Sequence, residues 1–263
     1  MPSFLKSRPQ TLFILLAGFF VVNAIVAEFI GIKIFSLEKT LGFEPVSFDL
    51  LGQQGLSFNL TAGVLLWPVV FVMTDLINEY YGPKAIRFLS WLTVGLILYA
   101  FIMVFAAIAT TPNDWWNLES GKLDVNPANH LLSMNLAFKK VMGQGLWIIV
   151  GSVIAFLVGQ ILDVFIFHRI KKVTGEGRIW LRATGSTLIS QFIDSYVVLI
   201  IAFYIGADWD LSRVLAIGTM NYLYKFIMAF LLTPVIYWVH NAIEAYLGHD
   251  QAAILKMEAM RNE

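Results

Sequence analysis

The sequence predicts an all-α integral membrane protein, a bundle of six transmembrane helices with both termini in the cytoplasm and a central polar cavity. Three observations support this fold class. Hydrophobic residues make up 58% of the 263 residues and charged residues only 14%, which is far from the composition of soluble domains. Six apolar stretches have the length of a membrane span, and four of them carry polar residues at helical spacing.

The spans follow from length and hydrophobicity. A helix needs about 20 predominantly apolar residues to cross the hydrocarbon core of a bilayer. Stretches of that length run roughly over residues 11–35, 59–81, 85–109, 144–167, 183–205 and 211–239. The first covers about 25 residues and lacks an Ala-x-Ala-like cleavage site, so we expect it to be retained as a helix. The chain, 1–263, is interpreted as one membrane domain with a polar tail at 241–263.

Basic residues set the predicted orientation. Lys6 and Arg8 precede the first span, Lys84 and Arg87 follow the second, and the link between the fourth and fifth spans is rich in Lys and Arg. These groups lie on one side of a six-span bundle, so the positive-inside rule places them, both termini and the tail in the cytoplasm. On the opposite side, residues 130–142 are predicted to form a short interfacial helix.

Composition and motifs exclude several classes of protein. Lys and Arg together number 18, as do Asp and Glu, so no net positive field attracts nucleic acid. The sequence contains no cysteine, which excludes disulfides, thiolate metal sites and cysteine nucleophiles. The four histidines are scattered, and no Walker, His-Glu-x-x-His or Gly-x-Ser-x-Gly motif is present. We therefore expect no metal, no cofactor and no catalytic residue.

Polar residues recur on one face of four spans. An ionisable group inside a membrane costs several kcal/mol unless it faces water, a cavity or a partner, so each is a candidate site residue. Residues three and four positions apart share a helical face. The polar sets are Asp75, Asn78 and Glu79 in the second span, Gln160 and Asp163 in the fourth, Gln191, Asp194 and Ser195 in the fifth, and Asn221 and Lys225 in the sixth.

Depth in the membrane relates these sets to one another. At a rise of about 1.5 Å per residue from the charged ends, Asp75 and Gln191 fall in one layer, roughly 13 Å from the cytoplasmic boundary. Asp194 and Lys225 fall near the midplane, where they can form an ion pair. Such a pair can also serve only to hold two helices together.

Other polar and aromatic residues lie closer to the membrane surfaces. Glu79 can be interfacial, and Glu28 is interpreted as more interfacial than functional. His168, beside Arg169, is interpreted as a headgroup contact. Trp67 and most other tryptophans lie near span ends and are typical of an interfacial aromatic belt.

The polar sets suit a flat heterocyclic ligand. A guanine-like edge presents adjacent N–H donors that a carboxylate accepts in pairs, and Asn or Gln can pair with either polarity. Aromatic side chains can stack on such a ring, and Phe71, Tyr196 and Tyr222 are the candidates, although ordinary packing also explains them. The predicted binding residues are Asp75, Asn78, Glu79, Gln160, Gln191, Asp194, Asn221 and Lys225.

Two segments also carry a family resemblance. They are FVMTDLINEYYGPKAIR, which contains Asp75, Asn78 and Glu79, and ATGSTLISQFIDS, which contains Gln191 and Asp194. Together they resemble the queuosine precursor transporter family, also called vitamin uptake transporters. The resemblance implies a multi-pass inner-membrane protein that imports 7-deazaguanine precursors such as preQ0 or preQ1 for salvage into the tRNA base queuosine. The polar signature of the family falls on these same five residues.

Other functions stay open at the level of sequence. The alternatives are a transporter of another small vitamin or nucleobase-like solute, or an intramembrane enzyme that uses Asp75, Asp163 or Asp194 as acid and base. The expected partners are a 7-deazapurine-like small molecule and membrane lipid, not nucleic acid. Without a nucleotide-hydrolysing motif, transport must use a gradient, exchange or a separate energising partner, and a homo-oligomer is also left open.

Overall fold

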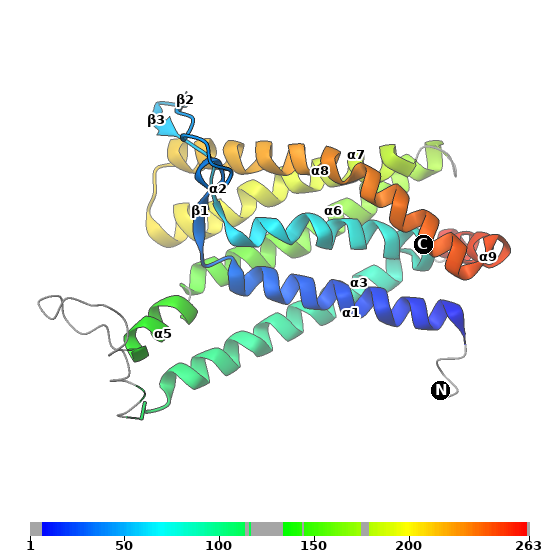
Figure 1. The fold of residues 1–263 in the computed structure, drawn as a ribbon, viewed down its shortest axis with the longest axis horizontal. Coiled ribbons are helices and arrows are strands. Elements are labelled where there is room, and N and C mark those ends of the chain that lie inside the picture. Colours follow the sequence, from blue (N-terminus) through cyan, green and yellow to red (C-terminus); the bar gives the residue numbers. More distant parts are fainter. Residues whose placement is uncertain (1–6, 114–115, 117–133, 144, 175–178, 262–263) are drawn as a thin grey trace, which may run out of the picture.

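The protein is a bundle of long helices that run beside one another. The computed structural model describes residues 7–113, 116, 134–143, 145–174 and 179–261. Its helices are α1 (Arg8–Ile30), α2 (Leu37–Thr40), α3 (Trp67–Ala109), α5 (Met134–Met142), α6 (Leu146–Thr174), α7 (Ile179–Leu199), α8 (Leu211–Leu247) and α9 (His249–Arg261), with a 3-10 turn η2 (Ala62–Leu65) and a π-helical stretch η4 (Ile200–Ile205). Figure 1 shows α5 at one end of the bundle and the start of α1, together with α9, at the other.

Five helical segments of the described chain are long and apolar enough to cross a membrane. They are Arg8–Ile30, Trp67–Ala109, Met134–Thr174, Ala183–Ile205 and Leu211–Leu247. Large apolar side chains such as Phe19, Trp91, Ile102 and Trp238 are exposed on the outside of the bundle. A soluble protein would bury most of them, whereas lipid covers them without cost. The prediction of a helical membrane protein is confirmed at this level.

The longest helix, α3, is broken at Gly82. This residue has φ 81° and ψ 176° and is followed by Pro83. That backbone conformation is open almost only to glycine, and Pro83 has no N–H to continue the helical hydrogen bonds. Figure 1 shows the first part of α3 running toward α9 and the second part returning toward α5. The predicted spans 59–81 and 85–109 therefore correspond to the two arms of one bent helix.

Short strands and turns connect α1 to α3 at the end of the bundle nearest α5. Strand β1 (Ile34–Ser36) pairs antiparallel with β4 (Asn59–Thr61), and β2 (Phe48–Leu50) pairs with β3 (Gln53–Leu56). The carboxylate of Glu38 accepts a hydrogen bond of 2.8 Å from the backbone N–H of Phe58 and one of 3.1 Å from the hydroxyl of Ser36. These contacts fix the end of α1 beside the start of α3.

The strands correct two predicted boundaries. The first span was expected to reach residue 35 and the second to begin at residue 59, but α1 ends at Ile30 and α3 begins at Trp67. The apolar residues in between form β1, β4 and η2 instead. A short apolar run does not distinguish a strand from a helix without its pairing partner.

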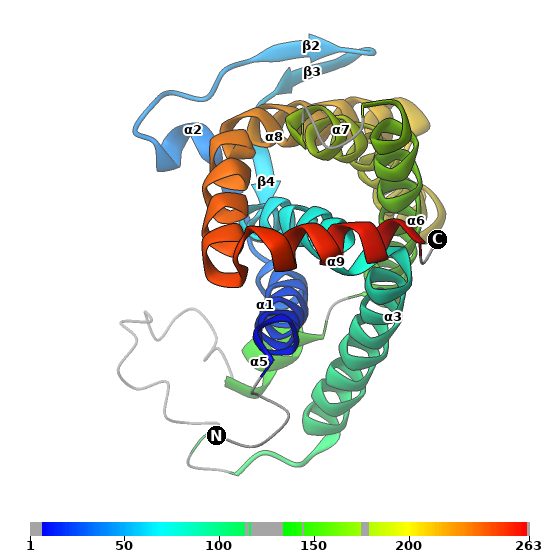
Figure 2. The same cartoon turned by 90° about the vertical axis from the view of Figure 1, so that its right-hand side faces the viewer.

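Helix α9 crosses the end of the bundle, as Figure 2 shows. Its buried Ala252 and Ala259 face the bundle, and a Cβ on Gly82 would lie 2.8 Å from the carbonyl oxygen of Ala259. The ammonium of Lys256 donates a hydrogen bond of 2.5 Å to Glu244 on α8. The predicted peripheral tail is thus the end of α8 followed by a helix packed on the bend of α3.

The predicted interfacial helix over residues 130–142 lies partly outside the described residues. Within them, α5 covers Met134–Met142, with Lys139 and Lys140 in its last turn and without a buried residue. Both lysines are exposed. Such a helix is typical of a segment that lies against the membrane surface.

Candidate functional site

A cavity of about 340 Å³ lies inside the end of the bundle nearest α5 and the strands. Ile34 of β1, Thr61 of β4 and Lys140 of α5 contribute to its wall, so it lies at the end opposite α9. Its size is within the range of roughly 300–1,000 Å³ that is usual for small-molecule sites. Its polar lining in the interior comprises Glu28 of α1, Ser152 of α6, Asp194 and Ser195 of α7, and Asn221 and Lys225 of α8.

An ion pair joins α7 and α8 at this cavity. The ammonium of Lys225 donates a hydrogen bond of 2.5 Å to Oδ2 of Asp194, and the two side chains are 9% and 17% exposed. The predicted contact between these residues is confirmed. Because the carboxylate remains partly open to the cavity, it can accept further donors from a ligand.

Glu28 is a cavity residue that the sequence interpretation missed. It lies in α1, is buried, and accepts a hydrogen bond from the hydroxyl of Ser152 on α6. Glu28 lies in the last turn of α1, and its side chain faces the cavity rather than the membrane surface. The available signal was that Glu28 is the one acidic residue in an otherwise apolar first span. Glu28 is only five residues from Lys33, which suggested a position at the membrane surface. The helix ends at Ile30, however, so Lys33 does not lie on the same helix as Glu28.

Trp67 also belongs to the cavity rather than to an aromatic belt. It begins α3, lines the cavity, and contacts Phe156 of α6 with ring centroids 5.6 Å apart. Phe203 of η4 lines the cavity as well. Trp67 and Phe203 therefore provide the aromatic surface of the cavity. The sequence had suggested Phe71, Tyr196 and Tyr222 for that role.

The predicted aromatic residues lie elsewhere. Phe71 is buried in α3, near Gly159 of α6. Tyr196 and Tyr222 each contact Phe192 on the α7–α8 side, with ring centroids 5.0 Å and 5.1 Å apart. None of the three lines the cavity among the described residues.

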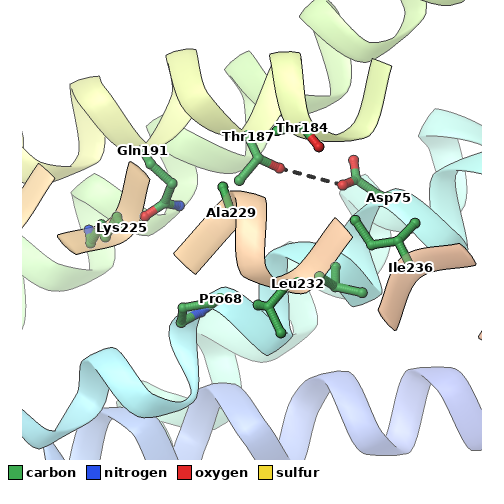
Figure 3. A pocket seen from close by; sticks show the side chains of 10 residues that line it. Pro68, Asp75, Thr184, Thr187, Gln191, Lys225, Ala229, Leu232 and Ile236 are labelled. Atoms are coloured by element: carbon green, nitrogen blue, oxygen red, sulfur yellow. Dashed lines mark hydrogen bonds between the residues drawn. The ribbon is translucent and has the colours of Figure 1, made fainter. Parts of the chain in front are cut away.

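A second, much smaller chamber lies between α3, α7 and α8, as Figure 3 shows. Its volume of about 20 Å³ is enough for a single water molecule. Asp75 and Gln191 both line it, at opposite ends in Figure 3, and Thr187 donates a hydrogen bond of 3.4 Å to Asp75. Lys225 lines both the small chamber and the large cavity and so separates them.

The remaining predicted residues join α3 to α6. Oδ1 of Asn78 lies 2.8 Å from Nε2 of His168, and the ammonium of Lys171 lies 3.0 Å from Glu79. All four side chains are buried. The interpretation of His168 as a headgroup contact and the interfacial alternative for Glu79 are therefore wrong.

Gln160 makes a similar contact about two turns before His168 in α6. Its side-chain oxygen accepts a hydrogen bond of 3.0 Å from the hydroxyl of Thr74. Gln160, Asn78 and Glu79 are absent from the described lining of the large cavity. They close the bundle between that cavity and the end covered by α9.

Removing one partner of the Glu79–Lys171 pair is expected to destabilise the protein. The side chains are 1% and 2% exposed, and breaking such a pair costs about 3–5 kcal/mol because it leaves the other charge buried. We expect Glu79→Ala to lower the free energy of unfolding in detergent by about that amount, and the double variant Glu79→Leu/Lys171→Met to recover most of the loss. Glu258→Ala, at an exposed position of α9, is the control. Equal losses in the single and double variants would contradict the pairing.

Comparison with known proteins places the chain in a family. Residues 61–239 match the family model of vitamin uptake transporters. The chain is 30% identical over 205 residues to the probable queuosine precursor transporter of Bacillus subtilis (strain 168), a match that covers 75% of this chain and 80% of that protein. It is 27% identical over 192 residues to the probable queuosine precursor transporter of Haemophilus influenzae (strain ATCC 51907 / DSM 11121 / KW20 / Rd), which covers 71% of each protein.

A third relative is the queuosine precursor transporter of Escherichia coli (strain K12). It is 25% identical over 186 residues, which is 70% of this chain and 74% of that protein. No solved structure matches the chain. The family match spans α3 to α8 and so includes Asp75, Asp194 and Lys225. With its apolar helices, its buried polar layer and these relatives, the chain belongs to the vitamin uptake transporter family and is a multi-pass membrane transporter, not an intramembrane enzyme.

Proposed function

We propose that the protein imports a 7-deazaguanine precursor of queuosine, such as preQ0 or preQ1, across the inner membrane for salvage into tRNA queuosine. The names of the three relatives support the substrate class. The observation that carries the proposal is the Asp194–Lys225 ion pair in the wall of a cavity of about 340 Å³. This pair presents an acceptor and a donor side by side to a polar heterocycle.

The cavity fits the hydrogen-bonding pattern of a guanine-like ring. The adjacent N–H donors of the ring match the carboxylates of Asp194 and Glu28. The carbonyl of the ring matches the ammonium of Lys225 or the amide of Asn221. Trp67 supplies an aromatic surface in the same cavity. A ligand that lacks this donor edge leaves buried polar groups unpaired, which disfavours its binding.

The other predicted site residues lie further inside the bundle than the Asp194–Lys225 pair. Asp75 and Gln191 line the next chamber, on the other side of Lys225, and would meet the ligand as it moves inward. Asn78, Glu79 and Gln160 hold α3 against α6 below that chamber. They would have to separate for the ligand to reach the cytoplasm, which makes them part of the inner closure of the transporter.

We further propose six membrane passes with both termini in the cytoplasm. The bend at Gly82 divides α3 into two arms, so the five apolar helical segments give six passes. Both α9 and the start of α1 lie at one end of the bundle in Figure 1, and the basic residues of the α6–α7 link favour the cytoplasm for that end. The large cavity then faces the outside of the inner membrane, as an importer awaiting its substrate requires.

Stabilisation of the purified protein by ligands tests the substrate. A ligand that binds only the folded state stabilises it by about 2.7 kcal/mol at a concentration 100 times its Kd. We expect preQ1 or preQ0 to raise the melting temperature in detergent, and adenine and hypoxanthine to leave it unchanged. In Lys225→Met the shift should be lost, while Lys139→Met on exposed α5 retains it. A shift with adenine or an unrelated vitamin alone would instead favour a different small solute as substrate.

A further inference from the structure

Two buried carboxylates lie at the inner side of Lys225. Asp75 of α3 is 3% exposed and Asp163 of α6 is 0% exposed. Among the described residues, the buried lysines Lys171 and Lys225 are paired with Glu79 and Asp194, and no lysine or arginine forms an ion pair with Asp75 or Asp163. Two ionised carboxylates at this depth would be unusually costly.

The two carboxyl groups lie against adjoining turns of α7. Thr187 donates a hydrogen bond of 3.4 Å to Asp75, and Ser190, one turn later on α7, donates one of 3.2 Å to Asp163. Ser186 and Thr187 lie close to both carboxyl groups. The two carboxyl groups are therefore close enough to repel each other when both are charged. Two neighbouring buried carboxyl groups do not both ionise, because their negative charges repel each other. One of the two groups therefore retains a proton.

Unsatisfied polar atoms mark the same place. Oδ1 of Asp75, Oδ2 of Asp163 and the amide nitrogen of Gln191 are buried and have no hydrogen-bond partner among the described residues. Gln191 is 5% exposed and lines the same small chamber as Asp75, at the end nearer Lys225, as Figure 3 shows. A proton on either carboxyl group turns an oxygen without a partner into a donor, and the chamber has room for one water molecule.

We propose that Asp75 and Asp163 form a proton-binding pair, and that its loading and release couple import to the proton gradient. With one shared proton the pair carries one negative charge. A second proton taken up from the outer side neutralises it, and release of that proton to the cytoplasm restores the charge. The pair is well placed for this exchange because Lys225 separates it from the outer cavity and the α3–α6 contacts separate it from the cytoplasmic end.

Charged or titratable side chains of the described residues lie on the helices packed around the pair. They are Glu79 on α3, His168 and Lys171 on α6, Asp194 on α7 and Lys225 on α8. Glu79 and Lys171 balance each other, as do Asp194 and Lys225. The uncompensated charge in this region therefore belongs to Asp75 and Asp163.

Infrared spectroscopy tests the proton itself without any substrate. We expect the purified protein at neutral pH to show the C=O absorption of a buried carboxylic acid, shifted in D₂O, and we expect the double variant Asp75→Asn/Asp163→Asn to lose it. Asp49→Asn, at an exposed carboxylate of the β2–β3 hairpin, should keep the band. Absence of a carboxylic-acid band from the wild type, or its full persistence in the double variant, would overturn the pair.

Proteoliposomes test the coupling, which rests on the proposed function. At zero membrane voltage, an interior one pH unit more alkaline should accumulate labelled preQ1 about tenfold if one proton accompanies each substrate. In Asp163→Asn we expect accumulation to fall to the external concentration while exchange of labelled for unlabelled preQ1 continues. Asp49→Asn should behave as wild type, and melting temperatures verify that both variants are folded.

The outcomes separate the two proposals. Exchange without any response to the pH gradient, or accumulation driven by a sodium gradient instead, would overturn proton coupling and leave the proposed function intact. Failure of both variants and wild type to bind or exchange preQ1 would overturn the proposed substrate, and the infrared result would still decide whether the pair holds a proton.

Discussion

Replacement of Asp194 by alanine is expected to reduce the rate of uptake at least about 30-fold below wild type. The carboxylate holds the ammonium of Lys225 at 2.5 Å, and both line the outer cavity. Truncating one partner of a buried charge pair costs about 2–5 kcal/mol, and each 1.4 kcal/mol is a factor of about ten in an equilibrium. The measurement is uptake of labelled preQ1 by cells in which the membrane content of the variant has been quantified.

A double variant separates loss of the site from loss of the fold. Asp194→Ala/Lys225→Ala removes both charges, so we expect its melting temperature to recover relative to Asp194→Ala while uptake stays low. Asp210→Ala, which removes an exposed carboxylate directly before α8, serves as the control with normal uptake. Substantial uptake by a correctly inserted Asp194→Ala protein would show that the pair does not contact the substrate.

Replacement of Gly82 by alanine is expected to destabilise the fold strongly. A non-glycine residue at φ 81° and ψ 176° costs about 1–3 kcal/mol. In addition, its Cβ would lie 2.8 Å from the carbonyl oxygen and 3.2 Å from Cα of Ala259, so α9 would have to move. We expect a loss of at least 3 kcal/mol, roughly the strain together with the clash, seen as a lower melting temperature and greater protease sensitivity of α9.

The same helix supplies a matched control. Gly95 lies in the second arm of α3, and a Cβ there would meet nothing within 4 Å. Gly95→Ala should be neutral or slightly stabilising, since alanine favours a helix by about 1 kcal/mol over glycine. If Gly82→Ala were no worse than Gly95→Ala, neither the break in α3 nor the contact with α9 would matter for stability.

Much of the site was predictable because burial cost can be read along a single helix. Asp75, Gln191, Asp194 and Lys225 stand out as polar residues in apolar spans, and their depth follows from the rise per residue. The structure brings these four together around two adjoining spaces. Their convergence was therefore a sound inference from spacing and hydrophobicity.

Partner choice within the polar layer was not predictable. Asn78 and Glu79 share a face with Asp75, yet they pair with His168 and Lys171 of α6, which follow them by 90 and 92 residues. His168 and Lys171 stand beside Arg169 and Lys172 in the sequence, which suggested that both lie at the membrane surface. Burial of His168 and Lys171 depends on the rotation of α6 about its axis, which packing against α3 sets.

The amino-acid sequence by itself determined the apolar segments that can span a membrane, the interruption between residues 81 and 85, and the polar residues of the interior. Hydrophobic length, backbone geometry and the cost of a charge in lipid are local properties, so they need no knowledge of neighbours. Only the tertiary structure decided that Glu28 and Trp67 face the cavity, that Glu79 pairs with Lys171, and that α9 covers the bend of α3. Those contacts join segments far apart in the chain, and they depend on helix rotation and tilt, which packing alone fixes.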